Sequence, residues 1–290
     1  MKILVSTDTS CLIDYELLKK NGISVFPLNV IINGEEYLDG VTINQEMLLN
    51  AMNEGKTIKT STPALGVIIE YFEELFKQGY DKIIHFTISS KLSSMNDLFK
   101  SVSRDYFDEK IVVIDAYSVS SLMLSHVLYA LDEVNKGTDL DEIVSSIEKR
   151  KENNYISFIP RDLTTLKNGG RISPVIAAIG NTLGLKPLIG LTNGELVKET
   201  MVTNVKKKFK DVFNARLSKY PVTDYDYTVI SFGADDSIFN ALIEHIESMT
   251  KIKVVTGIIP INVCAHCGPG TIGLLATPKI NGKSILDFAK

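Results

Sequence analysis

The chain has 290 residues, of which 44% are hydrophobic and 23% charged, an ordinary composition for a soluble globular protein long enough to form two domains. Its 31 basic and 35 acidic residues are mixed along the sequence and give a net charge of -4, so we expect neither a nucleic-acid groove nor stable insertion into a membrane. Three cysteines, the absence of an apolar run of membrane-spanning length and a direct start on a strand together predict a protein of the reducing cytoplasm.

The first half of the sequence alternates predicted strands with predicted helices. Apolar runs predict strands at residues 2–6, 23–32, 82–87 and 110–115. Capping and periodicity predict helices at residues 45–53, 63–78, from Ser93 onward, 121–136 and 140–151, while Asn33-Gly34 predicts a hairpin turn. This order indicates a mostly parallel sheet with helices on both faces. The charged end of the last helix marks the predicted boundary of an N-terminal α/β domain, residues 1–152.

Two local signals predict where helices of this half begin. Thr42 and Gln45 match a capping box for the helix at residues 45–53. Pro63 suits the first position of the next helix, because a proline there loses no helical hydrogen bond.

The second half has a different pattern, with hairpins among its strands and helices. The predicted strands are residues 155–159, 187–191, 196–202, 227–232 and 253–259, and Thr192-Asn-Gly194 predicts a hairpin. Predicted helices are residues 174–183, which are almost wholly apolar, 206–217 and 237–249. We therefore predict a smaller C-terminal α/β domain with a mixed sheet, residues 153–290.

A hydroxyl-rich loop separates the strand at residues 82–87 from the following helix. The first N–H groups of a helix have no partner within it and point outward with the positive end of the helix dipole, so an anion can bind there. The loop also lies at the carboxyl end of a predicted parallel strand, where α/β proteins usually bind ligands. Ser90, Ser93 and Ser94 thus either cap their own helix or help to bind a carboxylate or phosphate.

Two further polar segments carry candidate residues. Thr60, Ser61 and Thr62 precede Pro63 and have the same two alternatives, helix capping or anion binding. His266 alone among the four histidines lies beside a Gly-Pro-Gly turn, residues 268–270, and such a turn lets a ligand approach the backbone closely.

Several chemistries find little support in these residues. Cys264, His266 and Cys267 lack the second pair of ligands that a structural zinc site needs, so we predict no metal site. A serine nucleophile, Ser61 or Ser93, with His266 as its base lacks a Gly-x-Ser-x-Gly elbow and an orienting third residue. Small hydroxyls, helix-start amides and one histidine, together with apolar helices, instead suit an amphipathic ligand with an anionic head, and a fatty acid is the simplest such molecule.

The order of these motifs resembles the DegV family of bacterial fatty-acid-binding proteins over nearly the whole chain. The motifs are Thr7-Asp-Thr-Ser10, Thr60-Ser-Thr-Pro63, Ile88-Ser-Ser-Lys-Leu-Ser93, Val113-Ile-Asp115, Lys167-Asn-Gly-Gly-Arg-Ile-Ser173, Leu185-Lys-Pro187 and His266-Cys-Gly-Pro-Gly270. Each motif is weak alone, but seven in the same order form a specific signal.

The resemblance implies a lipid-binding carrier with one long-chain fatty acid, such as palmitate, stearate or oleate, in a cleft between two α/β domains. It implies no catalytic residue and no cofactor. The residues carried over as ligands of the carboxylate are Thr60, Ser61, Ser93, Ser94 and His266. Some members, the FakB-type subunits, present the bound acid to a separate fatty-acid kinase that makes the acyl phosphate, a step toward phospholipids. A serine-dependent acyl hydrolase or acyltransferase is the alternative function.

Two positions depart from the family pattern. Ser94 stands where the family usually has glycine, so its side chain occupies space near the carboxylate. Thr203 stands where many members have an arginine after the second hairpin, which puts docking of a kinase in doubt. Lys206, Lys207 and Lys208 are close by in the sequence and can supply charge or form a solvated face. Arg171 remains in its motif and is the better candidate for a partner contact or for bracing the domain interface.

Overall fold

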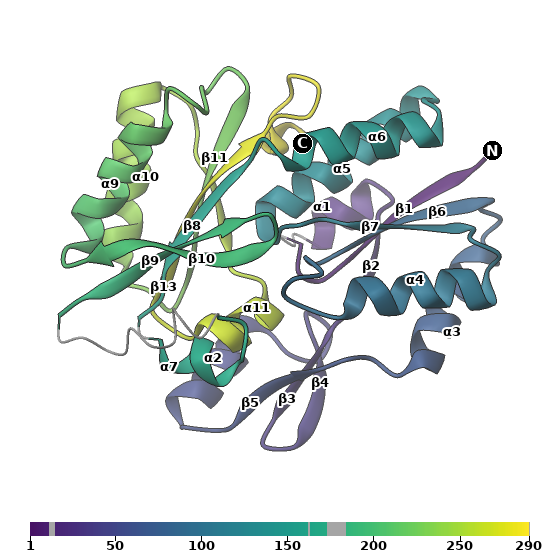
Figure 1. The fold of residues 1–290 in the computed structure, drawn as a ribbon, viewed down its shortest axis with the longest axis horizontal. Helices are drawn as coiled ribbons and strands as arrows, with labels where there is room; N and C mark the ends of the chain where they lie inside the picture. The colour runs from purple at the N-terminus through teal and green to yellow at the C-terminus, as the bar shows by residue number, and fades with distance from the viewer. Residues whose placement is uncertain (12–14, 162, 173–183, 290) are drawn as a thin grey trace.

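The computed structural model describes residues 1–11, 15–161, 163–172 and 184–289, and the strands of these residues form three sheets (Figure 1). The predicted apolar helix at residues 174–183 lies outside the described residues. A mixed α/β architecture with one parallel and one mixed sheet confirms the predicted fold class.

The first sheet is wholly parallel and has the order β2-β1-β6-β7. Its strands are β1 (Ile3–Asp8), β2 (Ser24–Phe26), β6 (Lys82–Thr87) and β7 (Ile111–Asp115). Helices α3 (Leu65–Phe76) and α4 (Met95–Tyr106) pack together on one side of it, while α5 (Ser120–Lys136) lies on the other (Figure 1). Covering both faces explains why these strands are continuous apolar runs and do not alternate.

A small antiparallel sheet corrects two predictions. The predicted strand at residues 23–32 is two strands, β2 and β3 (Asn29–Ile32), because the chain leaves the parallel sheet near Pro27, which has no N–H to donate. β3 then pairs with β4 (Glu35–Leu38), across a turn with positive φ at Asn33 and Gly34, and with β5 (Ile58–Ser61). The Thr60 region, predicted as a loop, is therefore partly a strand.

The third sheet is mixed and has the order β10-β9-β8-β13-β11-β12. Its strands are β8 (Tyr155–Ile159), β9 (Lys186–Thr192), β10 (Glu195–Val202), β11 (Tyr225–Phe232), β12 (Val255–Ile258) and β13 (Thr271–Pro278). Only the β11–β12 pair is parallel among these strands. Helices α9 (Val205–Arg216) and α10 (Asp236–Thr250) pack together and bury their apolar residues in one core with this sheet (Figure 1). The buried strand β13 in the interior of the sheet has no counterpart among the predicted elements.

The remaining helices are short or peripheral. They are α1 (Tyr15–Lys20), α2 (Gln45–Asn53), α6 (Leu140–Lys151), α7 (Thr164–Asn168), α11 (Ile261–Cys267) and the 3-10 turn η1 (Ile285–Asp287). No helix of the described residues combines the length and apolar character needed to cross a bilayer.

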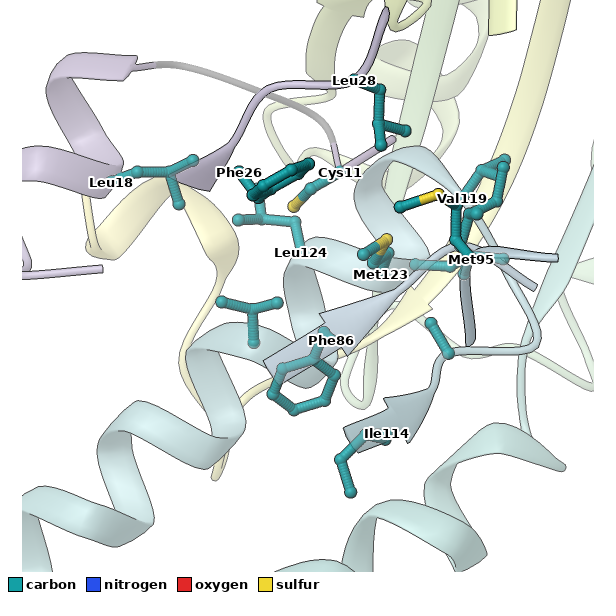
Figure 2. Close-up of a cluster of buried hydrophobic side chains, with 14 of the residues drawn as sticks. Cys11, Leu18, Phe26, Leu28, Phe86, Met95, Ile114, Val119, Met123 and Leu124 are labelled. Carbon is teal, nitrogen blue, oxygen red and sulfur yellow. The ribbon is translucent and has the colours of Figure 1, made fainter. Parts of the chain in front are cut away.

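Helix α5 joins the two large sheets into one core. It contacts β1 and β6 of the parallel sheet and β13 of the mixed sheet, and most of its residues up to Ala130 are buried. A helix that is buried on nearly all sides lies in the interior. Figure 2 shows Met123 and Leu124 of this helix among Phe26, Phe86 and Cys11 of the N-terminal half. The same apolar cluster continues to Ile230 and Leu275 of the mixed sheet.

The helix starts differ from the predicted caps. Asn44 caps α2 through its side chain, which accepts a hydrogen bond from the Met47 amide, so the predicted Thr42–Gln45 capping box is wrong. Helix α3 begins at Leu65 without a side-chain cap, so Pro63 precedes the helix. The hydroxyls of residues 60–62 therefore do not cap α3, which leaves them available for other contacts.

Candidate functional site

A cavity lies where the three sheets meet, and its walls come from both halves of the chain. With its open mouth it encloses about 1180 Å³. Much of the lining is apolar and includes Leu28, Met95, Val119, Phe158, Leu196 and Ile230. Leu28, Met95 and Val119 also belong to the core around α5 (Figure 2). The cavity thus has the apolar walls of a site for a hydrocarbon chain.

The six residues that the family resemblance indicated for ligand or partner contact all line this cavity: Thr60, Ser61, Ser93, Ser94, Arg171 and His266. Ser90, the other candidate serine of the loop before α4, is not among the lining residues. The six residues come from β5, the loop before α4, the segment after α7 and the last turn of α11. Four separate parts of the chain thus converge on one cavity, which an anionic head group with an apolar chain would fit.

A hydrogen bond between Thr60 and His266 connects two of these parts of the chain. Thr60 Oγ1 lies 3.0 Å from His266 Nε2, while His266 Nδ1 is buried and has no hydrogen-bond partner among the described residues. Burial, assisted by the positive charge of Arg171, lowers the pKa of His266 to about 4. The imidazole is therefore neutral at pH 7 in the empty protein and can donate one hydrogen bond.

The backbone of Gly169 fixes the place of the imidazole. A Cβ atom at Gly169 would lie 2.6 Å from His266 Nδ1. The backbone of Gly169 is right-handed, so its conformation alone does not require glycine. The close approach of the histidine ring is what requires it.

Ser61 is engaged by a carboxylate of the protein itself. Its Oγ donates to Glu36 Oε1 at 3.0 Å, and Asn29 Nδ2 donates to the same oxygen. Asn29 and Ser61 line the cavity, whereas Glu36 lies just outside it on β4 and is exposed. A ligand carboxylate that takes the Ser61 hydroxyl must therefore displace Glu36.

The loop before α4 presents its polar groups to the cavity. Ser94 occupies the N-cap position, but its side chain makes no capping hydrogen bond. Ser93 Oγ lies 3.4 Å from the Met95 amide, and Ser89 Oγ donates to the carbonyl of Gly194 in the β9–β10 turn at 2.8 Å. The loop is thus anchored to the mixed sheet through Ser89, while the Ser94 hydroxyl has no hydrogen-bond partner in the part of the chain that the structure describes.

Arg171 is exposed and links the two halves of the chain. Its Nε donates to the carbonyl of Leu92 at 3.3 Å, and its guanidinium also donates to the carbonyl of Gly169. No carboxylate of the described residues lies within ion-pair distance of it. The side chain braces the loop before α4 and places a positive charge at the cavity mouth.

A second, polar groove adjoins the cavity and shares Thr60, Arg171 and His266 with it. The cationic residues of its lining are Lys56, Lys59, Arg161 and Arg171, and no aspartate or glutamate of the described residues lines it. Glu54 nearby pairs with Lys56 at 2.8 Å. A groove with this charge in a protein of net charge -4 favours anionic groups close to the head of a bound ligand.

Four cavity residues carry features that the sequence did not indicate: Asn29, Ser120, Asn262 and Cys267. Asn262 Nδ2 donates to Asp39 Oδ2 at 2.8 Å and to Thr9 Oγ1 at 3.2 Å, which ties α11 to the N-terminal half. Ser120 has a positive φ of 60° and a buried hydroxyl without a partner among the described residues. No short-range pattern marks Asn29, Ser120 and Asn262, because these features arise from tertiary contacts and local backbone conformation.

The geometry lends no support to a serine nucleophile. His266 forms a hydrogen bond with a threonine and with no serine in the described part of the chain, and the Ser6–His85 hydrogen bond of 2.9 Å is fully buried in the parallel sheet. The described residues contain no cluster of three or more histidine, cysteine, aspartate or glutamate side chains that could bind a metal ion.

Comparison with known proteins gives a consistent result. Residues 2–279 match the family model described as uncharacterised protein, DegV family. A DegV domain-containing protein of Staphylococcus aureus is 30% identical over 292 residues, which covers 96% of this chain and 99% of that protein.

Two solved structures share the fold. A stearic acid-binding protein of Eubacterium ventriosum is 25% identical, with a TM-score of 0.84 and coverage of 96% of this chain and 98% of the other. The fatty acid kinase B3 protein of Streptococcus pneumoniae, solved with linoleic acid, is 17% identical, with a TM-score of 0.81 and coverage of 96% and 99%. The family match over nearly the whole chain and the shared fold establish that this protein belongs to the DegV family.

Proposed function

We propose that this protein binds one long-chain fatty acid, with the hydrocarbon chain in the apolar cavity and the carboxylate among Thr60, Ser61, Ser93, Ser94 and His266. The observation that carries the proposal is the convergence of these five residues on one apolar cavity. The stearic acid bound by the Eubacterium ventriosum relative supports the ligand class.

The physical chemistry of the cavity suits this ligand. Hydroxyl and amide donors to a carboxylate contribute about 1.5–3 kcal/mol each, so the site needs no buried cation. Each methylene group removed from water contributes about 0.8 kcal/mol, which favours long chains over short ones. Because His266 is neutral in the empty protein, it can donate a hydrogen bond without the desolvation cost of a buried charge.

We further propose that the protein is a carrier that presents the carboxylate to a separate phosphorylating enzyme. The fatty acid kinase B3 protein of Streptococcus pneumoniae, solved with linoleic acid, supports this role. The cationic groove beside the residues proposed to bind the carboxylate also supports it, because such a groove suits phosphate groups or an acidic partner surface. Arg171 lies in both the cavity and the groove, so it is the residue we propose for partner contact. With Thr203 in place of the family arginine, docking would depend on the groove.

Native mass spectrometry of the freshly purified protein, followed by denaturing extraction and lipid analysis, tests the proposal. We expect an added mass of one fatty acid, released intact on denaturation. Ser93→Ala should retain the ligand about tenfold more weakly, which corresponds to one lost hydrogen bond of about 1.4 kcal/mol. A bare mass that persists after incubation with palmitate, stearate and oleate would contradict the proposal, and an acyl group covalently attached to a serine would identify an enzyme instead.

A further inference from the structure

Two thiols flank His266, one of the residues proposed to bind the carboxylate, on the same short helix. Cys264 and Cys267 are three residues apart on α11, and His266 lies between them in sequence. Neither thiol is part of a disulfide, and both are buried, as is the third cysteine, Cys11. The proposed carrier function gives neither cysteine of α11 a role.

The two thiols differ in whether they face the cavity. Cys267 lines the cavity beside His266, whereas Cys264 lies behind it, with its Sγ donating to the carbonyl of Ile259 at 3.1 Å. Burial and the neighbouring thiol of Cys267 raise the pKa of Cys264. The pair therefore consists of one thiol that a small molecule in the cavity can reach and one adjacent thiol that it cannot reach directly.

The spacing of the two cysteines permits a disulfide after a small local change. Side chains three residues apart on a helix have Cβ atoms about 5–6 Å apart. A disulfide needs about 3.5–4.5 Å between the same atoms. The bond therefore requires the last turn of α11, which carries His266, to tighten. This turn ends at Gly268, whose φ of 74° stops the helix there.

We infer that Cys264 and Cys267 form a reversible disulfide when a peroxide enters the empty cavity, and that this bond weakens the hold of the site on a carboxylate. The Cys267 sulfur attacks one peroxide oxygen, giving a sulfenic acid and one water when the oxidant is hydrogen peroxide. The Cys264 sulfur then attacks the sulfenic sulfur, forming the S–S bond and releasing a second water. Two thiols lose two electrons and two protons, and the peroxide is reduced to two waters.

The consequence for ligand binding rests on the proposed fatty-acid function. Tightening the turn moves His266 relative to Thr60, whose hydroxyl is 3.0 Å from the imidazole in the reduced protein. A bound acyl chain would in turn cover Cys267, because both occupy the same cavity. The loaded protein is thus protected from oxidation, and the empty protein is the form that responds.

The experiment compares delipidated protein with protein loaded with oleate, each treated with hydrogen peroxide and then with an alkylating reagent under denaturing conditions. Residues 254–279 form one tryptic peptide that holds both cysteines, so the disulfide appears as a loss of two hydrogens and resistance to alkylation. We expect this product to form faster in the delipidated protein. We also expect oleate affinity to fall about tenfold after oxidation and to recover on reduction with dithiothreitol.

Variants separate the possible results. Cys264→Ala and Cys267→Ala should each abolish the disulfide, whereas Cys11→Ala, which changes a buried thiol outside the cavity lining, should leave it intact. Fully alkylated Cys264 and Cys267 after peroxide treatment would overturn the inference, as would a disulfide that leaves oleate affinity unchanged. If neither the reduced nor the oxidised protein binds any fatty acid, the proposed function fails, while the mass measurement still decides whether the disulfide forms.

Discussion

His126 is a residue whose burial is not offset by hydrogen bonds. Neither ring nitrogen has a partner in the described structure, and burial, reinforced by the positive charges of Arg150 and Lys151, lowers its pKa to about 3. The unfolded chain takes up this proton near pH 6.5, while the folded chain does not. His126 therefore lowers the free energy of unfolding progressively as pH falls from 6.5 toward 3, and it has no such effect above pH 6.5.

His126→Leu should remove this dependence. Relative to the wild type, we expect the free energy of unfolding of the variant to rise by about 2 kcal/mol between pH 6.5 and pH 4.5, since the slope approaches about 1.4 kcal/mol per pH unit only well below pH 6.5. Urea unfolding at both pH values measures it. Any cost of fitting leucine into the core is the same at both pH values and cancels in the comparison. Parallel pH profiles for the two proteins would show that His126 is protonated, or not buried, in the folded state.

Glu36 is a residue that competes with the proposed ligand for the Ser61 hydroxyl. We expect Glu36→Gln to bind oleate about two- to fivefold more tightly, because an exposed charge interaction is worth about 0.2–1 kcal/mol. Glu35→Gln is the matched control, since Glu35 is also exposed on β4 but accepts its hydrogen bond from Tyr37. Titration of delipidated protein with a fluorescent fatty acid measures both variants. If both variants gain the same affinity for the fatty acid, the change in net charge explains the effect and the release of the Ser61 hydroxyl does not.

At the scale of elements, the end of α7 acts as a support for α11. Gly169→Ala places a methyl group on His266 Nδ1, where only 2.6 Å is available, so the ring must move away from its present position. We expect fatty-acid affinity to fall about tenfold while the fold persists. Gly170→Ala is the control, because no atom lies within 4 Å of its added Cβ. Its φ of 69° predicts a stability loss of about 1–2 kcal/mol with affinity unchanged. Loss of affinity in both variants would trace the effect to the loop and not to His266.

The elements also show how far sequence patterns reach. The parallel strands and long helices were predictable because apolar runs and helical periodicity are local signals, whereas the predicted caps of α2 and α3 were not found. Strand β5 was not, since Ile58-Lys-Thr-Ser61 is mostly polar and becomes a strand only by pairing with β3. The seven residues of α11 are too few to show a helical period, so no local pattern indicated that His266 lies in the last turn of a helix. Thr60 and His266 are 206 residues apart, so no local pattern shows that they meet; the chemistry of hydroxyls with one histidine and the family resemblance suggested that they act together.

At the scale of the whole molecule, a buried polar network joins α11 to the N-terminal half. Asp39 Oδ2 accepts from both the backbone amide and the side chain of Asn262, at 3.0 and 2.8 Å, and Ser10 Oγ donates to Asn262 Oδ1 at 3.2 Å. Burial outweighs these hydrogen bonds and raises the pKa of Asp39 to about 7. Because Asn262 also lines the cavity, the network couples the protonation of Asp39 to the wall of the ligand site.

The sign of the resulting pH dependence follows from the two states of Asp39. The unfolded chain loses this proton near pH 3.8, whereas the folded chain keeps it until about pH 7. Unfolding therefore releases a proton between these values, and the contribution of Asp39 to stability falls as pH rises through this window. Asp39→Asn can still accept from Asn262 but cannot ionise. We expect the stability of the wild type relative to this variant to decline by up to about 1.4 kcal/mol per pH unit from pH 4.5 to 6.5 and to level off above pH 7.

Urea unfolding of both proteins at pH 4.5, 5.5, 6.5 and 7.5 tests this expectation, with Glu35→Gln as a control that removes an exposed carboxylate and should follow the wild type. Asp8, whose pKa burial raises to about 6, is present in all three proteins, so its own pH dependence largely cancels. A wild type that gains stability relative to Asp39→Asn as pH rises would mean that the ionised carboxylate is the favoured form in the fold. The Asn262 hydrogen bonds would then outweigh burial, and the network would hold the two halves together more firmly at neutral pH than in acid.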